Sequence, residues 1–269
     1  MQLLSLIVVL IAAALVLCVL MACAWAIQQR TGNSSWIDFG WTSSVGLVGT
    51  ASALLGVDGV LPGPRQWLIA LLCACWCVRL AWHLLARALR GIDDPRYAAL
   101  AKQWGGDASR RMFWFAQSQA LAALPLVLAV VLAAHRPGVW PDGGDVAGML
   151  VVTCAIIGAA VSDAQLRRFT ADPSNRGKVC DSGLWRWSRH PNYFFEWLGW
   201  VGFAITALAA SRNDQIGWLA LLAPLEMYVL LVYVSGIPPL EAHMAQSRSD
   251  SWASYRSRTS AFFPWPPFA

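Results

Sequence analysis

The sequence has little charge and no long polar segment. Only 13% of its 269 residues are Asp, Glu, Lys or Arg, whereas 57% are hydrophobic. Soluble globular domains usually contain about 25% charged residues, so this composition excludes an ordinary soluble protein. The polar segments between the apolar runs are short, and we therefore expect one domain, residues 1–269, without a separate soluble part.

Several motifs of soluble enzymes are also missing. The sequence contains no G-x-G-x-x-G and no phosphate-binding P-loop. Six of its seven cysteines lie in apolar runs, where a thiol behaves as a small hydrophobe, and their spacing is not that of zinc ligands. We therefore expect neither a Rossmann fold nor a metal site.

Long apolar runs dominate what is present. Each of seven runs approaches the roughly 20 residues that a helix needs to cross hydrocarbon, namely 3–27, 35–56, 66–86, 112–134, 146–166, 192–211 and 216–235. The first run lacks the basic start of a signal peptide, so we interpret it as an anchor. The sequence predicts an all-α, multi-pass membrane protein with seven transmembrane helices.

The basic residues indicate the orientation of these helices. With the N-terminus outside and the C-terminus cytoplasmic, most of the 20 lysines and arginines fall in cytoplasmic segments, as membrane proteins prefer. This asymmetry accounts for the net charge of +5, which gives no reason to expect nucleic acid. An integral, multi-pass membrane location is expected.

Two clusters of ionisable residues lie near the predicted cytoplasmic ends of apolar runs, where such residues are costly and tend to be functional. Arg79, His83 and Arg87 recur every four residues and share one helix face. Asp163 and Arg167 are also four residues apart. The alternatives are an arginine that extends to the membrane surface and a simple i,i+4 ion pair.

The strongest cluster is "SGLWRWSRHPNYFFEWLGW", residues 182–200. Pro191 suits the first turn of a helix, because proline lacks the amide hydrogen that would be unpaired there. Asn192, Glu196 and Trp200 then follow four residues apart, on one face. A buried Glu196 needs a hydrogen-bond donor, which is either a neighbouring arginine or a ligand.

The segment before this cluster is polar and basic. Asn175, Arg176 and Lys178 surround Gly177 in a turn-rich loop that can bind phosphate. A loop that contacts only water or lipid headgroups is the alternative.

Together these motifs resemble the steroid 5α-reductase superfamily, in its bacterial integral-membrane branch. The resemblance rests on "GLWRWSRHPNYFFEWLGW", the preceding "DAQLRRFTADPSNRGK" and the following "VSGIPPLEAHMAQSRSDSWASYRSRTSAFFPWPP". The "RHPNY" core is shared with sterol C14 reductases and isoprenylcysteine carboxyl methyltransferases. It is therefore specific for a superfamily and not for one reaction.

The resemblance implies a seven-helix bundle whose cytosolic half binds NADPH in a pocket, with substrate-side helices at 1–140 and a cofactor-binding core at 146–265. By motif position it assigns cofactor contacts to Asp163, Arg167, Asn192, Glu196 and Trp200. Charge and proximity to these motifs add further candidates, namely Arg79, Arg87, Asn175, Arg176, Lys178, Arg189, His190, Tyr193 and Tyr255.

The implied reaction is hydride transfer to the C=C bond of a lipophilic enone, such as a 3-oxo-4-ene steroid or a similar isoprenoid lipid. The Gln-Glu pair and the tyrosine that hold the ketone in related reductases are missing from the corresponding spans. We therefore predict Asp38 as the proton donor, with His83 as the second candidate and Glu226 as the third. Trp36, Trp41 and Glu226 are the predicted substrate contacts.

Two alternatives stay open. An S-adenosylmethionine-dependent membrane methyltransferase shares the His-Pro motif, but a sulfonium ligand does not require so many cations. A lipid-binding or transport protein would distribute polar groups across the bilayer, whereas here most lie in the predicted inner half. The expected partners are a lipophilic substrate that enters from the bilayer and the membrane lipids, with the chain as a monomer.

Overall fold

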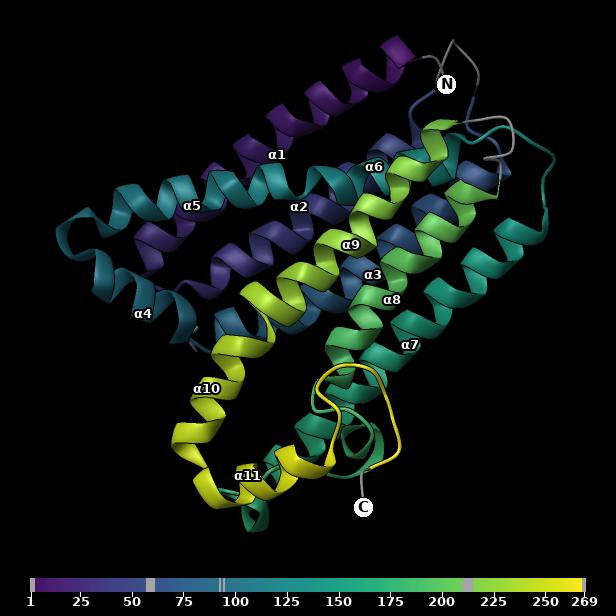
Figure 1. The fold of residues 1–269 in the computed structure, drawn as a ribbon. Helices are drawn as coiled ribbons and strands as arrows, with labels where there is room; N and C mark the ends of the chain where they lie inside the picture. The colour runs from purple at the N-terminus through teal and green to yellow at the C-terminus, as the bar shows by residue number, and fades with distance from the viewer. Residues whose placement is uncertain (1–2, 57–60, 92, 94, 210–214, 268–269) are drawn as a thin grey trace. The chain divides into compact units, whose positions relative to one another are not determined.

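A computed structural model describes residues 3–56, 61–91, 93, 95–209 and 215–267, and all regular structure within these ranges is helical (Figure 1). The predicted all-α class is therefore confirmed. The α-helices are α1 Leu3–Thr31, α2 Ser35–Leu54, α3 Pro64–Leu89, α4 Pro95–Trp104, α5 Ala108–Ala122, α6 Leu124–His135, α7 Gly143–Ala171, α8 Pro191–Leu208, α9 Leu222–Val229, α10 Ile237–Ser247 and α11 Ser249–Arg258. The short turns are the 3-10 helices η1 Gly105–Asp107, η2 Pro173–Asn175, η3 Gly183–Arg186 and η4 Gln215–Leu221, and the π-helical η5 Leu230–Val234.

Five helical segments in the described ranges are long and apolar enough to cross a membrane. They are Leu3–Thr31, Pro64–Leu89, Leu100–His135, Gly143–Ala171 and Ile216–Ser247. The two other predicted spans correspond to α2 and α8, which have 20 and 18 residues and are not among these five. The count of seven and the orientation stay predictions.

Two predicted spans have internal breaks. The run 112–134 is divided at Ala123 into α5 and α6, because Pro125 has no amide hydrogen to continue the helical ladder. The run 216–235 begins as η4, continues as α9 and ends in η5. Gly236 lies between η5 and α10, one residue after Ser235, and a Cβ there would lie 2.5 Å from the Leu231 carbonyl oxygen and 2.8 Å from its Cα. Only glycine fits this turn.

The chain forms two compact units, Met1–Ala147 with Phe203–Ala223, and Gly148–Gly202 with Pro224–Ala269. In the first unit α2 packs against α1, α3 and α6. The contact between α2 and α3 is close because Gly46 has no side chain. A Cβ at Gly46 would lie 2.1 Å from Sγ and 2.2 Å from Cβ of Cys77.

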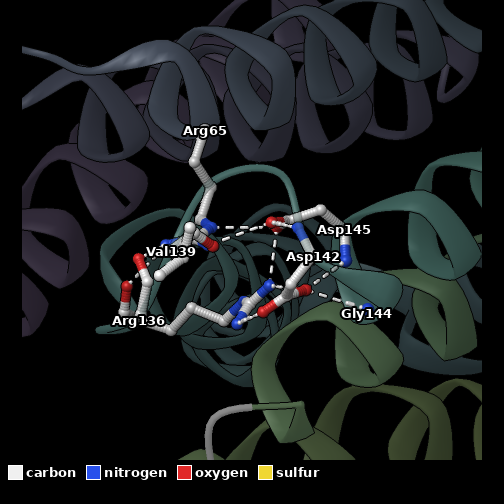
Figure 2. Close-up of polar contacts among 7 residues, drawn as sticks. Arg65, Arg136, Val139, Asp142, Gly144 and Asp145 are labelled. Carbon is white, nitrogen blue, oxygen red and sulfur yellow. Dashed lines mark hydrogen bonds and ion pairs between the residues drawn. The ribbon is translucent and has the colours of Figure 1, made fainter.

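A buried network of two arginines and two aspartates joins α3, the end of α6 and the start of α7 in the first unit (Figure 2). Arg65 donates from Nε and Nη2 to the two carboxylate oxygens of Asp145, at 2.8 and 2.9 Å. Arg136 pairs with Asp142 and also lies 2.8 Å from Asp145 Oδ1. We call these four residues the Asp145 network. The side chain of Asp145 is 1% exposed and that of Arg136 is 2% exposed.

Backbone groups complete the Asp145 network. Arg65 also donates to the carbonyl oxygens of Arg136 and Val139, at 3.0 and 2.8 Å. Asp142 accepts from its own helix start, through the amides of Gly144 and Asp145. Hydrogen bonds from Arg136 hold the pKa of Asp142 well below its usual range. The loop between α6 and α7 is therefore held by ion pairs as well as by hydrogen bonds to its backbone.

In the second unit α7 and α8 lie side by side, and the segment between them folds against the C-terminal tail (Figure 1). The backbone amide of Arg189 donates to the Ser260 carbonyl at 2.8 Å, and that of Trp265 donates to Trp187 at 2.9 Å. The hydroxyl of Ser188 donates to the Phe262 carbonyl at 2.9 Å. These bonds fix the segment from which α8 begins.

Aromatic rings fill the space beside this segment. Phe262 packs edge-on against Phe194, Trp197 and Tyr228, with ring centroids 5.4 to 5.9 Å apart. The Trp197 indole also donates to the carbonyl oxygen of Pro224 at 3.0 Å. Aromatic side chains therefore connect α8, α9 and the tail within the second unit.

Candidate functional site

The start of α8 carries a compact set of charged and polar side chains. The helix begins at Pro191, as predicted. The two residues before it, Arg189 and His190, both approach Glu241 of α10. Arg189 Nε lies 2.8 Å and His190 Nε2 lies 3.1 Å from the same oxygen, Glu241 Oε1. We call these three residues the His190 cluster.

Arg189 has several partners besides Glu241. Its Nη1 donates to the carbonyl oxygens of Thr259 and Arg256 in the tail. Its guanidinium carbon lies 5.8 Å from the ring centroid of Trp252. Arg189 thus ties the start of α8 to α10, α11 and the tail, and its role as a phosphate ligand stays a prediction.

His190 lies inside the unit and not at an open mouth, because only 3% of its surface is exposed. Its ring stacks on Tyr193, with centroids 5.5 Å apart and an interplanar angle of 12°. Burial lowers the pKa of His190 below its ordinary value, and the nearby Glu241 carboxylate offsets only part of that effect. The ring is therefore neutral at pH 7.

The motif-derived residues Asp163 and Asn192 are brought together. The Asn192 side-chain amide on α8 lies 3.4 Å from Asp163 Oδ1 on α7. Glu196 and Trp200 continue the same face of α8 and are 9% and 1% exposed. The predicted row of polar groups therefore lies on a buried helix face.

Basic residues lie at the end of α7 and in the loop that follows it. Arg167 and Arg176 are exposed, and neither forms an ion pair with a carboxylate in the part of the chain that the structure describes. Lys178 is exposed and interacts electrostatically with Asp172. Asn175 donates to the carbonyl oxygen of Phe169 at 3.1 Å and so holds the loop against the end of α7.

Tyr255 holds the backbone of the segment that precedes α8. It is 2% exposed, and its hydroxyl donates to the carbonyl oxygens of Trp185 and Ser188. Burial raises the pKa of Tyr255, which keeps this donor protonated. A direct cofactor contact by Tyr255 stays a prediction.

A second polar cluster surrounds Asp38 in the first unit. Arg87 and Arg96 donate to Asp38 Oδ2 at 2.7 and 3.0 Å, and the Tyr97 hydroxyl donates to Oδ1 at 2.6 Å. The Asp38 carboxylate therefore accepts hydrogen bonds from two guanidinium groups and one phenol. The proton-donor role of Asp38 stays a prediction. In the hydrogen bond between Tyr97 and Asp38, the tyrosine hydroxyl is the donor.

Tyr97 is held in place from both sides. Burial, reinforced by the Asp38 charge, raises the pKa of Tyr97 well above its usual range. The side-chain amide of Gln119 lies 3.3 Å from the Tyr97 oxygen. Trp41, a predicted substrate contact, donates to the Gln119 carbonyl at 3.2 Å.

The remaining candidates lie on three helices. Arg79 and His83 are half-buried on α3, about two turns and one turn before Arg87, respectively. Trp36 is half-buried on α2 and packs edge-on against Phe39 at 5.7 Å. Glu226 on α9 has a buried carboxylate oxygen, Oε2, with no hydrogen-bond partner within the described ranges.

Three kinds of site residue were missed from the sequence. Glu241 lies 51 residues after His190, and Tyr97 lies 59 residues after Asp38. The Asp145 network joins residues up to 80 positions apart. One signal was present, because Glu241 is an acidic residue in the otherwise basic segment that follows an apolar span.

Metal binding has no candidate in the described ranges, where no three His, Cys, Asp or Glu side chains gather.

The fold and the buried His190 cluster define a helical membrane protein with a polar site at the start of one helix. The chain belongs to the family described as protein of unknown function DUF1295, whose model matches residues 24–259. This family is associated with steroid 5α-reductase-like membrane proteins. Neither the curated proteins nor the solved structures contain a match.

Proposed function

We propose that the protein is an NADPH-dependent membrane reductase that saturates the C=C bond of a lipophilic enone. The proposed substrate is a 3-oxo-4-ene steroid or a similar isoprenoid lipid that enters from the bilayer. In the same proposal, the chain crosses the bacterial inner membrane seven times and the start of α8 faces the cytoplasm.

One observation carries this proposal. Buried hydrogen-bonding groups on α7 and α8 lie in the same unit as exposed arginines that have no carboxylate partner in the described ranges. A ligand with several negative charges and several hydroxyl and amide groups matches that combination. NADPH has a diphosphate and an additional 2′-phosphate, whereas S-adenosylmethionine has no phosphate.

The residues present fit such a ligand. Arg167 and Arg176 would bind phosphate oxygens, and Asp163 with Asn192 would bind hydroxyl or amide groups. When bound, NADPH supplies the hydride. In this proposal, the apolar helices around the site exclude water from the reacting groups. The exclusion of water strengthens hydrogen bonds to the enolate that develops during the reaction.

The reaction also needs a proton. We assign the role predicted for Asp38 to the Asp38–Tyr97 pair, in which the phenol holds the proton and the carboxylate orients it. His83 and Glu226 are the further candidates. Asp38→Phe is unsuitable as a test of this proton-transfer role. It would leave Arg87 and Arg96 without the carboxylate that they share, and would therefore also destabilise the protein.

Nucleotide binding tests the proposal directly. NADPH at about 100 times its Kd should stabilise the detergent-purified protein by about 2.7 kcal/mol, because it binds the folded state only. NADH and S-adenosylmethionine should stabilise it much less. The measurement is the midpoint of thermal unfolding, followed by tryptophan fluorescence. Equal shifts from all three ligands would refute the assignment, and a larger shift from S-adenosylmethionine would favour a methyltransferase.

The phosphate-binding assignment has its own test. Arg176→Ala should raise the Kd for NADPH about tenfold, since a charge-assisted hydrogen bond is lost at a partly hydrated site. Arg168→Ala is the matched control, because Arg168 is also exposed, also lacks a carboxylate partner in the described ranges, and has no assigned role. Titration calorimetry measures both. Equal weakening by the two variants would indicate only a general effect of charge.

A further inference from the structure

The imidazole of His190 has one nitrogen with a partner and one without. Nε2 lies 3.1 Å from Glu241 Oε1. Nδ1 is buried and has no hydrogen-bond partner anywhere in the described ranges. A buried polar atom without a partner costs about 1–3 kcal/mol, and such atoms are uncommon in folded proteins. This nitrogen therefore needs an explanation.

The surroundings of the ring determine where its proton lies. Glu241 Oε1 already accepts a hydrogen bond from Arg189, so the carboxylate is ionised and can only accept. Nε2 must then carry the hydrogen. A second hydrogen on Nδ1 would add a positive charge next to Arg189 in a buried place and would itself have no acceptor. The arrangement therefore favours the neutral ring with a hydrogen on Nε2 alone.

We propose that Glu241 is a positioning residue that fixes His190 in this tautomer, so that Nδ1 accepts a hydrogen bond from an N–H or O–H group of the bound nucleotide. This inference rests on the proposed function and specifies which part of NADPH the ring contacts. The contacting group is a hydrogen-bond donor, such as the carboxamide or a ribose hydroxyl. It is not a phosphate.

Charge supports this choice. The positive charge of Arg189 is neutralised by Glu241, and its donors are further occupied by Thr259 and Arg256. The three residues of the His190 cluster are therefore close to neutral together, and the nearby Arg256 approaches Glu241 only from an exposed position, at 3.8 Å. A phosphate oxygen would face the lone pair of Nδ1, which repels it. The exposed Arg167 and Arg176 are the better phosphate ligands.

Two substitutions of His190 separate its two nitrogens. In His190→Gln, the side-chain amide can reach the position of Nε2 and still donate to Glu241, but the Nδ1 acceptor is lost. In His190→Asn, an amide oxygen can replace Nδ1, but the bond to Glu241 is lost. We expect His190→Gln to unfold at nearly the parent temperature and to bind NADPH about tenfold more weakly, which is the loss of one hydrogen bond. His190→Asn should bind NADPH more tightly than His190→Gln and unfold at a lower temperature.

Nitrogen NMR reads the tautomer without any nucleotide. In protein with ¹⁵N-labelled histidine, assigned by comparison with His190→Gln, the parent should show Nδ1 unprotonated and Nε2 protonated. Addition of NADPH should shift the Nδ1 resonance. Glu241→Gln should give a mixture of tautomers and weaken NADPH binding. Asp181→Asn is the control, because it breaks the exposed ion pair with Arg258, which also ties the tail, without touching the ring.

The outcomes distinguish this inference from the proposed function. If the parent does not bind NADPH, both are wrong. If the parent binds NADPH but Nδ1 is protonated, or if His190→Gln binds NADPH as tightly as the parent, only the inference is wrong. If Asp181→Asn weakens binding as much as Glu241→Gln, Glu241 acts on the tail and not on the ring, which also overturns the inference.

Discussion

Asp145→Ala is expected to destabilise the protein by about 3–5 kcal/mol, the largest effect of any single change considered. The substitution leaves Arg65 and Arg136 buried without the carboxylate that both contact at 2.8 Å. Asp145→Asn should destabilise less, because the amide oxygen can still accept from Arg65. The loop between α6 and α7 should become accessible to protease in both variants.

The measurement is the free energy of unfolding in mixed micelles, titrated with a denaturing detergent. Asp107→Ala is the matched control, since Asp107 is an exposed aspartate in the same unit with no ion pair in the described ranges. Equal stability of the two variants would show that the Asp145 network contributes little. A pH scan adds a check. The contribution of Asp142, whose pKa is lowered in the folded state, should be present above about pH 4 and should disappear as the pH falls further.

Gly46→Val should destabilise the protein by about 3 kcal/mol, at the upper end of overpacking effects. The new Cβ alone would lie 2.2 Å from the Cβ of Cys77, an atom that cannot rotate away. The helices α2 and α3 must therefore separate, and they also carry Asp38 and Arg87. Yield of folded protein in size-exclusion chromatography and the thermal unfolding midpoint would both fall.

A pair of substitutions tests whether contact with Cys77 causes this loss of stability. Gly46→Ala combined with Cys77→Gly moves the side chain from one helix to the other and should recover much of the stability that Gly46→Ala loses. Gly106→Val is the control, because nothing lies within 4 Å of a Cβ at Gly106. If the combined variant is no more stable than Gly46→Ala, contact with Cys77 is not the reason for the loss.

The sequence predicted the helices well, because hydrophobic length is a local property. It placed the start of α8 at Pro191, where the structure begins the helix. It did not predict the break at Ala123 or the π turn at Leu230–Val234. The backbone geometry at both places depends on neighbouring helices and on single residues such as Pro125 and Gly236. An apolar run has the same composition whether or not it bends.

Pairs of residues were harder to predict than single residues. Asp163 and Asn192 were both candidates from the family motif, and they lie 3.4 Å apart. Glu241 was not a candidate, because no helical periodicity connects it to His190. The same holds for Arg65 and Asp145, which lie on different helices. A sequence shows which residue types are costly in a membrane, but three-dimensional packing determines which of them neutralise each other.

The tight turn at Gly236 joins η5 to α10 in the second unit. A methyl group there would press on the backbone of Leu231 and displace α10, which carries Glu241. The histidine ring would then lose its anionic neighbour although neither residue had changed. A variant at position 236 would therefore mimic a defect in the proposed nucleotide binding, and its phenotype should not be attributed to instability alone.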